Sequence, residues 1–442
     1  MASHLFGILR LHSVQEDQDR LSDPLAFPEE HQTITGTTYT TGRLFLRVSS
    51  PAASLARRDG ILVACAGHLA ATDAGEVGLN AAELFMLRYL KHGRDTARHT
   101  NGHFVAVVWE ESPAKLRLFQ DWFPGLQTLY MAQNSGCLYF CDRMGPILRS
   151  LPKLATHLDE AALYQYLRRS YISAPRTIFA GIRQVEGGQV VEAVDGAVTH
   201  HHSPPWPFPV DRLADEELAL QQYEMVLRHA IHSIQAANRP VFLLSGGLDS
   251  SVNVALGSEH PTAPLITLCT GAPRYTSDAK YAQEVAARFG THHHECLFDG
   301  AEIEALPRIV WEMENPFFEP GIMLSWVTLG NISRYADTVM GADLCDQVFG
   351  SCIDLAMLRY AEDRRLLGQQ HKLRQAVHAL CLGKHGRGNV LIEKVYTRLF
   401  GKTDLNNWCG VYGFSRPQLA LMLRKSIPFT GHFEDGIAPS GQ

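Results

Sequence analysis

The sequence lacks the features that mark membrane-spanning, secreted and nucleic-acid-binding chains. No uninterrupted apolar run approaches the roughly 18 residues that a membrane span needs, and Met1-Ala2-Ser3-His4 does not open a secretory signal. The net charge is −6, and no basic block is larger than short patches such as Arg364-Arg365. The nine cysteines show no paired metal-ligand spacing. These absences predict a cytoplasmic chain with reduced thiols that binds neither membranes nor nucleic acids.

A proline-rich stretch divides the chain, which at 442 residues is long enough for two or three domains. Four prolines fall within Ser203–Pro209, where neither a helix nor a central strand could continue. Before this stretch, short apolar or alternating runs between turn residues predict two stacked antiparallel sheets. After it, strand and helix patterns alternate, which predicts a parallel sheet with crossover helices. We therefore predict domains over 1–202 and 215–442, joined by a linker over 203–214.

The most informative motif is the loop Ser245-Gly246-Gly247-Leu248-Asp249-Ser250-Ser251, which lies between an apolar run and a helical pattern. Glycines let the backbone approach a ligand closely, and the N–H groups at a helix start attract anions. Asp249 would repel phosphate unless a cation lay between them, so the loop predicts a bridging Mg²⁺. The chain lacks the Gly-Lys-Ser/Thr ending of a Walker loop. The alternative is a Gly-Gly turn that is merely capped by Asp and Ser.

The loop resembles the SGGxDS motif of the ATP pyrophosphatases, and three further stretches resemble the synthetase domain of asparagine synthetases. These stretches are Thr276–Glu295, Glu314–Pro320 and Val339–Gly350. The resemblance implies an ATP site and a Mg²⁺ site, the latter at Asp249 and Asp346. The implied nucleotide-binding residues are Ser245, Gly246, Gly247, Asp249, Ser250, Ser251, Leu268 and Gly341. Asp343 competes with Asp346, because the spacing from Gly341 is one residue longer than the family's usual spacing.

The same resemblance implies an acidic residue that orients or deprotonates the attacking nitrogen. Glu314 and Glu319 are the candidates, since nearby aromatic residues such as Phe317 and Phe318 could desolvate a proton-accepting carboxylate. Two carboxylates beside prolines could equally be surface loop residues. The family also has a lysine that neutralises the α-phosphate, and the sequence does not choose among its candidates. These are Lys384, Lys394, Lys402 and Lys425.

Residues 1–200 resemble the glutaminase domain that precedes the synthetase domain in asparagine synthetases. The resemblance rests on Asn101–Ala106, Gly125–Tyr130 and Thr177–Ile182. It implies a degenerate Ntn-glutaminase-like antiparallel β sandwich, followed by an ATP-pyrophosphatase-like parallel α/β synthetase domain with a helical C-terminus. That glutaminase class uses an N-terminal cysteine whose own amine is the base, whereas the first cysteine here is Cys65. We therefore expect glutamine hydrolysis to be lost and the first domain to serve as a scaffold.

The missing cysteine bears on the source of the attacking nitrogen. Two branches of the family that lack this cysteine are the β-lactam synthetases and the macrolactam synthetases that close lasso peptides. Our leading hypothesis is an AMP-forming carbon–nitrogen ligase of the lasso type, which acts on a precursor peptide in antibiotic biosynthesis with a leader-binding peptidase as partner. Two other enzymes are alternatives. One is a lactam synthetase for a small amino-carboxylate, and the other is an ammonia- or amine-dependent intermolecular ligase. A catalytically quiet nucleotide-binding scaffold is the alternative from another class.

Overall fold

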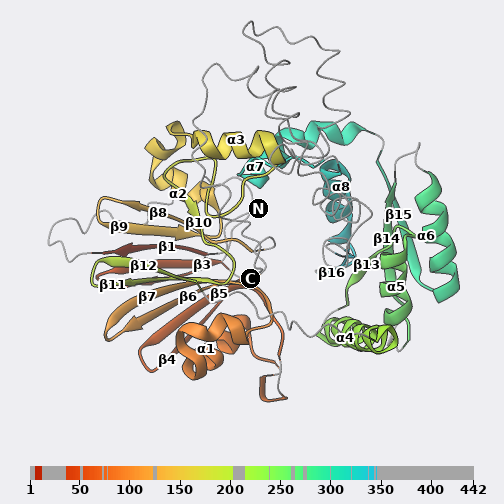
Figure 1. Cartoon of the computed structure of the whole chain (residues 1–442), viewed down its shortest axis with the longest axis horizontal. Coiled ribbons are helices and arrows are strands. Elements are labelled where there is room, and N and C mark those ends of the chain that lie inside the picture. The colour runs from red at the N-terminus through yellow and green to blue at the C-terminus, as the bar shows by residue number, and fades with distance from the viewer. Residues whose placement is uncertain are drawn as a thin grey trace, which may run out of the picture. The chain divides into compact units, whose positions relative to one another are not determined.

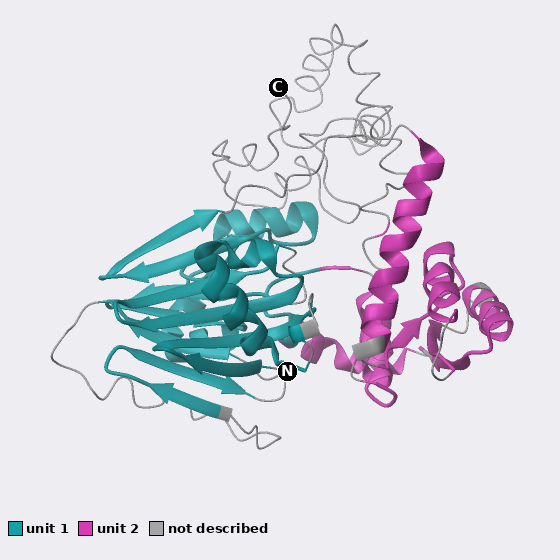
Figure 2. Cartoon of the chain, turned by 90° about the horizontal axis from the view of Figure 1, so that it is seen from below, with its two compact units in different colours: residues 1–208, 312–317, 410–442 teal, residues 209–311, 318–409 magenta. Residues whose placement is uncertain are grey.

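The chain forms two compact units. The computed structural model describes residues 5–11, 36–49, 53–71, 74–76, 78–122, 127–202, 215–237, 239–259, 264–271, 276–298, 300–319, 321–336, 338–342 and 345. Unit 1 comprises residues 1–208, 312–317 and 410–442, and unit 2 comprises residues 209–311 and 318–409 (Figure 2). The sequence did not predict that residues 312–317 group with unit 1. The predicted linker 203–214 lies outside the described residues.

Unit 1 contains two six-stranded sheets in which all neighbouring strands are antiparallel. The first sheet has the strand order β10 (Arg183–Gln184), β8 (Tyr130–Asn134), β9 (Cys137–Cys141), β1 (Leu5–Arg10), β3 (Leu44–Ser49) and β2 (Gly36–Thr40). The second has the order β12 (Ala197–His202), β11 (Gln189–Val194), β7 (Ala114–Gln120), β6 (Gly102–Glu111), β5 (Ile61–Leu69) and β4 (Ala53–Arg58). The predicted pair of antiparallel sheets is confirmed (Figure 1).

Both faces of the second sheet are buried, as strand β6 shows. Val105 and Val107 point into the core between the sheets, whereas Phe104 and Ala106 point into a second core beneath helix α1 (Ala81–His92). Successive side chains on a strand face opposite sides, so an almost continuous apolar run is what a strand buried on both faces requires. Helix α1 packs on β4 and β5 (Figure 1).

Helix α1 begins where its sequence supplies a capping box. The Asn80 side chain accepts a hydrogen bond from the Glu83 N–H at 3.1 Å, and the Glu83 carboxylate accepts one from the Asn80 N–H at 2.9 Å. Two backbone donors that the helix itself leaves unpaired are thereby satisfied. Unit 1 also contains α2 (Met144–Ser150), α3 (Glu160–Arg169) and the short 3₁₀ turns η2 (Ala74–Glu76), η3 (Gly93–His99) and η4 (Pro152–Thr156).

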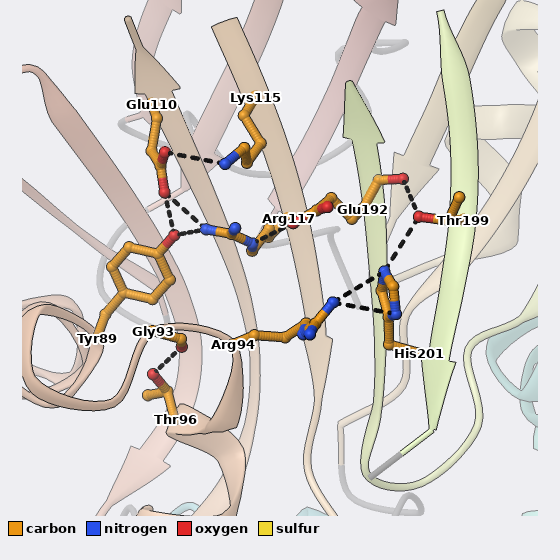
Figure 3. A network of polar contacts seen from close by, with 10 residues as sticks. All are labelled: Tyr89, Gly93, Arg94, Thr96, Glu110, Lys115, Arg117, Glu192, Thr199 and His201. Carbon is orange, nitrogen blue, oxygen red and sulfur yellow. Dashed lines mark hydrogen bonds and ion pairs between the residues drawn. The ribbon is translucent and has the colours of Figure 1, made fainter. Parts of the chain in front are cut away.

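A chain of polar contacts crosses the α1 side of the second sheet (Figure 3). Arg117 on β7 pairs with Glu110 on β6 and with Glu192 on β11, with 2.6 Å between nitrogen and oxygen in each pair. The Tyr89 hydroxyl of α1 contacts both Arg117 and Glu110. Burial, together with the Glu110 carboxylate, raises the pKa of Tyr89, so this phenol stays neutral at physiological pH. The network satisfies charges that the packed helix would otherwise leave without partners.

Unit 2 is built around a four-stranded parallel sheet with the order β15, β14, β13, β16. In chain order its elements are α4 (Glu216–Ala237), β13 (Val241–Leu243), α5 (Leu248–Gly257), β14 (Ile266–Gly271), α6 (Thr276–Phe289), β15 (His292–Leu297), η5 (Ala301–Ala305), α7 (Leu306–Met313), α8 (Ile322–Ile332) and β16 (Val339–Met340). The predicted parallel α/β arrangement is confirmed. None of the helices in the described part of the chain is long and apolar enough to cross a membrane.

Replacing Phe119 by alanine should destabilise unit 1. The Phe119 ring is fully buried and lies 5.1 Å from the ring of Phe85, centroid to centroid. Removing a buried aromatic ring costs about 3–5 kcal/mol, which should lower the calorimetric transition of unit 1 by about 10 °C. The control Tyr171→Ala changes an exposed residue of the same unit, and its transition should stay close to that of the parent. Equal melting of both variants and the parent would contradict the proposed core.

Candidate functional site

The candidate site lies at the carboxyl edge of the parallel sheet, beside the strands β13 and β16. Strand β13 pairs with β14 on one side and with β16, much later in the chain, on the other. The order of connection reverses at this point, and open parallel sheets bind ligands beside such a reversal at the carboxyl ends of their strands. The loop Ser245–Gly247 follows β13, and Gly341 follows β16. The structure therefore brings the two predicted nucleotide-binding stretches to one edge.

A side chain of α5 links the two stretches. The Asn253 amide donates a hydrogen bond to the carbonyl oxygen of Gly341 at 3.2 Å, and Asn253 is only 8% exposed. A buried amide that satisfies a backbone carbonyl fixes the spacing between two loops, because breaking the bond would leave both groups unpaired. Sequence reasoning missed Asn253. The detectable signal was a polar residue within the otherwise apolar run Val252–Leu256.

The loop after β13 requires glycine at position 246. The backbone of Gly246 has φ +79°, and a Cβ there would lie 2.4 Å from the Cβ of Tyr281 and 2.7 Å from the amide nitrogen of Ala282. Both neighbours belong to α6. Glycine is the residue that combines a positive φ with so close a backbone approach. The loop therefore folds tightly against α6, and this packing fixes its position at the sheet edge.

The serines of the motif organise the loop from within. The Ser250 hydroxyl accepts a hydrogen bond from the Ser245 N–H at 3.3 Å and donates one to the Gly247 carbonyl at 3.1 Å. The Ser251 hydroxyl donates to the same carbonyl at 2.7 Å. Ser250 is 7% exposed, so its first role is to hold the turn. Such local side-chain bonds to the backbone are typical of turns that lead into helices.

Asp249 lies in the first turn of α5, and its side chain is exposed. Asp249 and a residue much later in the sequence both affect the pKa of Tyr223 on α4. Burial raises the pKa of the Tyr223 phenol, and the charges of Cys345 and Asp249 raise it further. Cys345 immediately precedes Asp346 in the sequence. The pKa of Tyr223 is therefore raised both by Asp249 and by the residue next to Asp346, the predicted second metal ligand.

Several predicted residues lie outside the described part of the chain. They are Asp343, Asp346, Lys384, Lys394, Lys402 and Lys425. Within the part of the chain that the structure describes, no group of three or more His, Cys, Asp or Glu residues is arranged to hold a metal ion. The predicted nucleotide-binding residue Leu268 lies on β14 with 1% exposure, and its side chain packs with Val241 and Ile332. Any contact of Leu268 with a ligand would therefore come from its backbone.

The two predicted acid/base residues belong to different units. Glu319 is exposed in unit 2. Its carboxylate lies beside Gly321, the N-cap residue of α8, where a Cβ added to the glycine would come within 2.8 Å of a carboxylate oxygen. Glu314 belongs to unit 1, where its carboxylate accepts hydrogen bonds from the N–H groups of Met144 and Gly145 at 2.8 and 2.7 Å. Of the two carboxylates, Glu319 is therefore the one that lies in the same unit as the loop Ser245–Gly247.

Two thiols of unit 1, those of Cys65 and Cys141, lie in poor positions for nucleophilic chemistry. Cys65 is completely buried on β5, and burial raises the pKa of its thiol far above the ordinary value. Cys141 is also completely buried, and both burial and the Asp142 carboxylate raise the pKa of its thiol. A thiol acts as a nucleophile only as the thiolate, which burial disfavours. Neither thiol suits hydrolysis of glutamine.

Comparison with known protein families agrees with both units. The asparagine synthase family model matches residues 222–400, and the glutamine amidotransferase domain model matches residues 78–203. The fold thus combines amidotransferase-like antiparallel sheets with a parallel-sheet synthetase domain. Together with the relatives below, these matches support the asparagine synthetase superfamily as the group to which the chain is related.

Curated relatives are distant and longer than the matched region. The sequence is 24% identical over 274 residues to the glutamine-hydrolyzing asparagine synthetase 1 of Bacillus subtilis, covering 61% of this chain and 42% of that protein. It is 27% identical over 226 residues to the glutamine-hydrolyzing asparagine synthetase B of Escherichia coli, covering 48% of this chain and 39% of that protein. The chain therefore spans less than half the length of these relatives.

Among solved structures, the chain aligns with a glutamine phosphoribosylpyrophosphate amidotransferase from B. subtilis. The alignment covers 57% of this chain and 51% of that chain, with a TM-score of 0.25 and 9% sequence identity. An alignment at this TM-score is too distant to support a further structural conclusion.

Replacing Gly246 by alanine should weaken binding of ATP, the nucleotide that the sequence predicts. The new Cβ would meet α6 backbone, and a non-glycine residue at this φ is strained by about 1–3 kcal/mol. We expect the dissociation constant for ATP with Mg²⁺, measured by calorimetric titration, to rise by about tenfold or more. The control Gly330→Ala lies in α8, where a Cβ has open space, and it should bind ATP like the parent. Unchanged affinity of the Gly246 variant would exclude this loop as the site.

Proposed function

We propose that this chain is an ATP-dependent ligase that activates a carboxylate as its adenylate and couples it to an amine. The carrying observation is the tight loop Ser245–Gly247 at the reversal point of the parallel sheet, within the region that matches the asparagine synthase model. Both features point to the same substrate chemistry. A loop at such a position suits the phosphates of a nucleotide, and the matched family describes amide formation by its name.

The proposed reaction has two steps. In the first, an oxygen of the substrate carboxylate attacks the α-phosphorus of ATP, the bond from that phosphorus to the bridging oxygen breaks, and pyrophosphate leaves. In the second, the amine attacks the acyl carbon, the carbon–nitrogen bond forms, and AMP departs with the acyl oxygen. The amine loses a proton, and the exposed carboxylate of Glu319 in unit 2 is our candidate to accept it.

The donor chemistry at the loop fits a magnesium ion. Asp249 offers an exposed carboxylate one turn into α5, and Mg²⁺ prefers carboxylate and phosphate oxygens. A Mg²⁺ ion held by Asp249 and, as the sequence predicts, by Asp346 would neutralise negative charge on the pyrophosphate leaving group. The N–H groups at the start of α5 and the positive end of its dipole would also favour the phosphates.

We also propose that the nitrogen does not come from glutamine. Cys65 and Cys141 are completely buried and burial raises the pKa of both thiols, which supports a unit 1 without glutaminase activity. A substrate that carries its own amine would then be closed into a ring, with the entropy advantage of an intramolecular reaction. Our preferred substrate is a precursor peptide that is closed as a macrolactam, with a leader-binding peptidase as partner.

The same adenylation and amide formation would also serve other substrates. A small amino-carboxylate would give a lactam, and free ammonia or a second molecule's amine would give an intermolecular amide. A nucleotide-binding scaffold without turnover is the proposal from another class. Pyrophosphate release separates these functions, because the scaffold releases none and the enzymes release it only with their own substrates.

Replacing Asp249 by asparagine should abolish turnover. The test uses MgATP with three probes: L-aspartate with ammonium chloride, a β-amino acid, and a linear peptide with a free N-terminal amine and an acidic side chain. We expect the parent to release pyrophosphate and AMP with one of them, and the Asp249→Asn variant to be slower by about 100-fold or more, because a carboxylate that holds the metal is lost. The matched control Asp195→Asn lies in a unit 1 turn at φ +48°, which asparagine tolerates.

The outcomes separate the proposals. Equal rates for the Asp249→Asn variant and the parent would exclude the assigned metal ligand. No pyrophosphate release by the parent with any of the three probes would favour the scaffold over the ligase.

Glutamine should not serve as a nitrogen source. We expect no release of glutamate when the parent is incubated with L-glutamine, with or without MgATP, because the buried thiols of unit 1 are not ionised. Glutamate release would be measured with a coupled dehydrogenase assay, and a glutamine-hydrolyzing asparagine synthetase serves as positive control. Glutamate release that disappears in a Cys65→Ala variant would overturn the proposed loss of glutaminase activity.

A further inference from the structure

The acidic segment Glu312–Asn315 is held within unit 1 by three kinds of contact. The guanidinium of Arg143 lies 3.2 Å from a carboxylate oxygen of Glu312 and 3.3 Å from one of Glu314. The Glu314 carboxylate also accepts hydrogen bonds from two backbone N–H groups at the start of α2. The Asn315 side-chain oxygen accepts a third backbone bond, from the Ile178 N–H at 2.9 Å.

The helix α2 depends on this segment for its cap. Its N-cap residue is Arg143, whose side chain makes no capping hydrogen bond. The first N–H groups of a helix have no partner within the helix, and a carboxylate satisfies them best because it also opposes the helix dipole. Glu314, about 170 residues away in the sequence, provides both acceptors. A local cap of Ser, Thr, Asp or Asn would have made this long-range contact unnecessary.

The contacts are poorly exposed and act on a strained backbone. The side chains of Arg143, Glu312 and Glu314 are 17%, 12% and 13% exposed. Glu314 has φ +55°, a region that residues other than glycine rarely adopt. Such a conformation persists only where the surrounding contacts determine it. The paired carboxylates of Glu312 and Glu314 would also repel each other without the guanidinium between them.

The chain enters unit 1 at Glu312 and leaves it after Phe317, and Glu319 follows two residues later. The anchored segment Glu312–Asn315 therefore holds the chain four residues before Glu319, the carboxylate that we propose as proton acceptor. Glu319 follows Asn315, the last anchored residue, by four positions, and each residue spans at most about 3.5 Å of chain, so the Glu319 Cα stays within about 14 Å of the Asn315 Cα. Anchoring thus limits the freedom of the Glu319 backbone.

We propose that Arg143 and the first turn of α2 anchor the segment Glu312–Asn315, and that Arg143 and Glu314 are positioning residues for the amide-forming step, a part that rests on the proposed function. The anchor gives unit 1 a role that needs no glutamine hydrolysis. Glu314 acts as the helix cap and ion-pair partner, and the proton acceptor is Glu319. Loss of the anchor would slow the reaction of the amine without affecting binding of ATP.

Hydrogen–deuterium exchange on the full chain tests the anchor itself. In an Arg143→Ala variant, we expect the amides of Met144, Gly145 and the segment 312–317 to exchange faster by about tenfold or more, because Glu314, which accepts both α2 hydrogen bonds, loses the guanidinium that holds it in place. Arg143→Lys keeps the charge but cannot bridge both carboxylates with a planar fork, and it should give an intermediate effect. Peptides that cover the loop 245–251 should exchange as in the parent.

The matched control is Lys153→Ala, which removes an exposed positive charge from the 3₁₀ turn after α2. Its exchange should equal that of the parent. Unchanged exchange in both Arg143 variants would overturn the anchor. A variant that loses protection throughout unit 1 would show a general folding defect, and Glu312→Gln, which removes the ion pair with Arg143 but keeps Glu314 as the cap of α2, then decides by its local effect on 312–317.

Kinetics test the positioning role with whichever of the three probes the parent turns over. We expect Arg143→Ala to lower kcat by about tenfold or more, with an unchanged KM for ATP, and Arg143→Lys to restore part of the rate. An unchanged kcat with increased exchange in 312–317 would overturn the positioning role and leave the anchor. A parent that turns over none of the probes would overturn the proposed function and the positioning role together, while the exchange result would still decide the anchor.

Discussion

The close approach of the Gly246 backbone to α6 determines how the sheet edge of unit 2 is built. A side chain at this position would collide with Tyr281 and Ala282, so the loop can pack against α6 only as glycine. This packing places the start of α5 at the carboxyl end of β13, where the strand order reverses. The exposed Asp249, the buried Ser250 and the Asn253 bond to the loop after β16 all take their positions from it.

Unit 1 combines an amidotransferase-like fold with thiols that are buried at Cys65 and Cys141. Its two sheets bury one core between them and a second core under α1. Burial is what stabilises such a sandwich, and the same burial disfavours ionisation of Cys65 and Cys141. The proposed anchor at Arg143 would give this unit a structural role that depends on ion pairing and helix capping.

The two acidic candidates, Glu314 and Glu319, show that a motif does not specify the surroundings of each of its residues. Glu314 and Glu319 stand five residues apart in the same acidic and proline-containing stretch, and the sequence treats them alike. The structure gives them different surroundings, since Glu314 caps α2 in unit 1 and Glu319 is exposed in unit 2. The proline-rich linker and the second metal ligand, Asp346, stay predictions, because they lie outside the described residues.

The sequence by itself determined the two classes of sheet and the loop that marks the site. Local patterns suffice for these features, because strand burial, helix periodicity and a Gly-Gly turn each follow from residues that are close in the chain. Only the tertiary structure decided the roles of Asn253, Tyr223 and Arg143. The contacts of Asn253 and Arg143 join residues 88 and 169 positions apart, and the pKa of Tyr223 is raised by the charges of residues that are distant in the sequence. Such partners are chosen by the packing of whole elements, which no local pattern records.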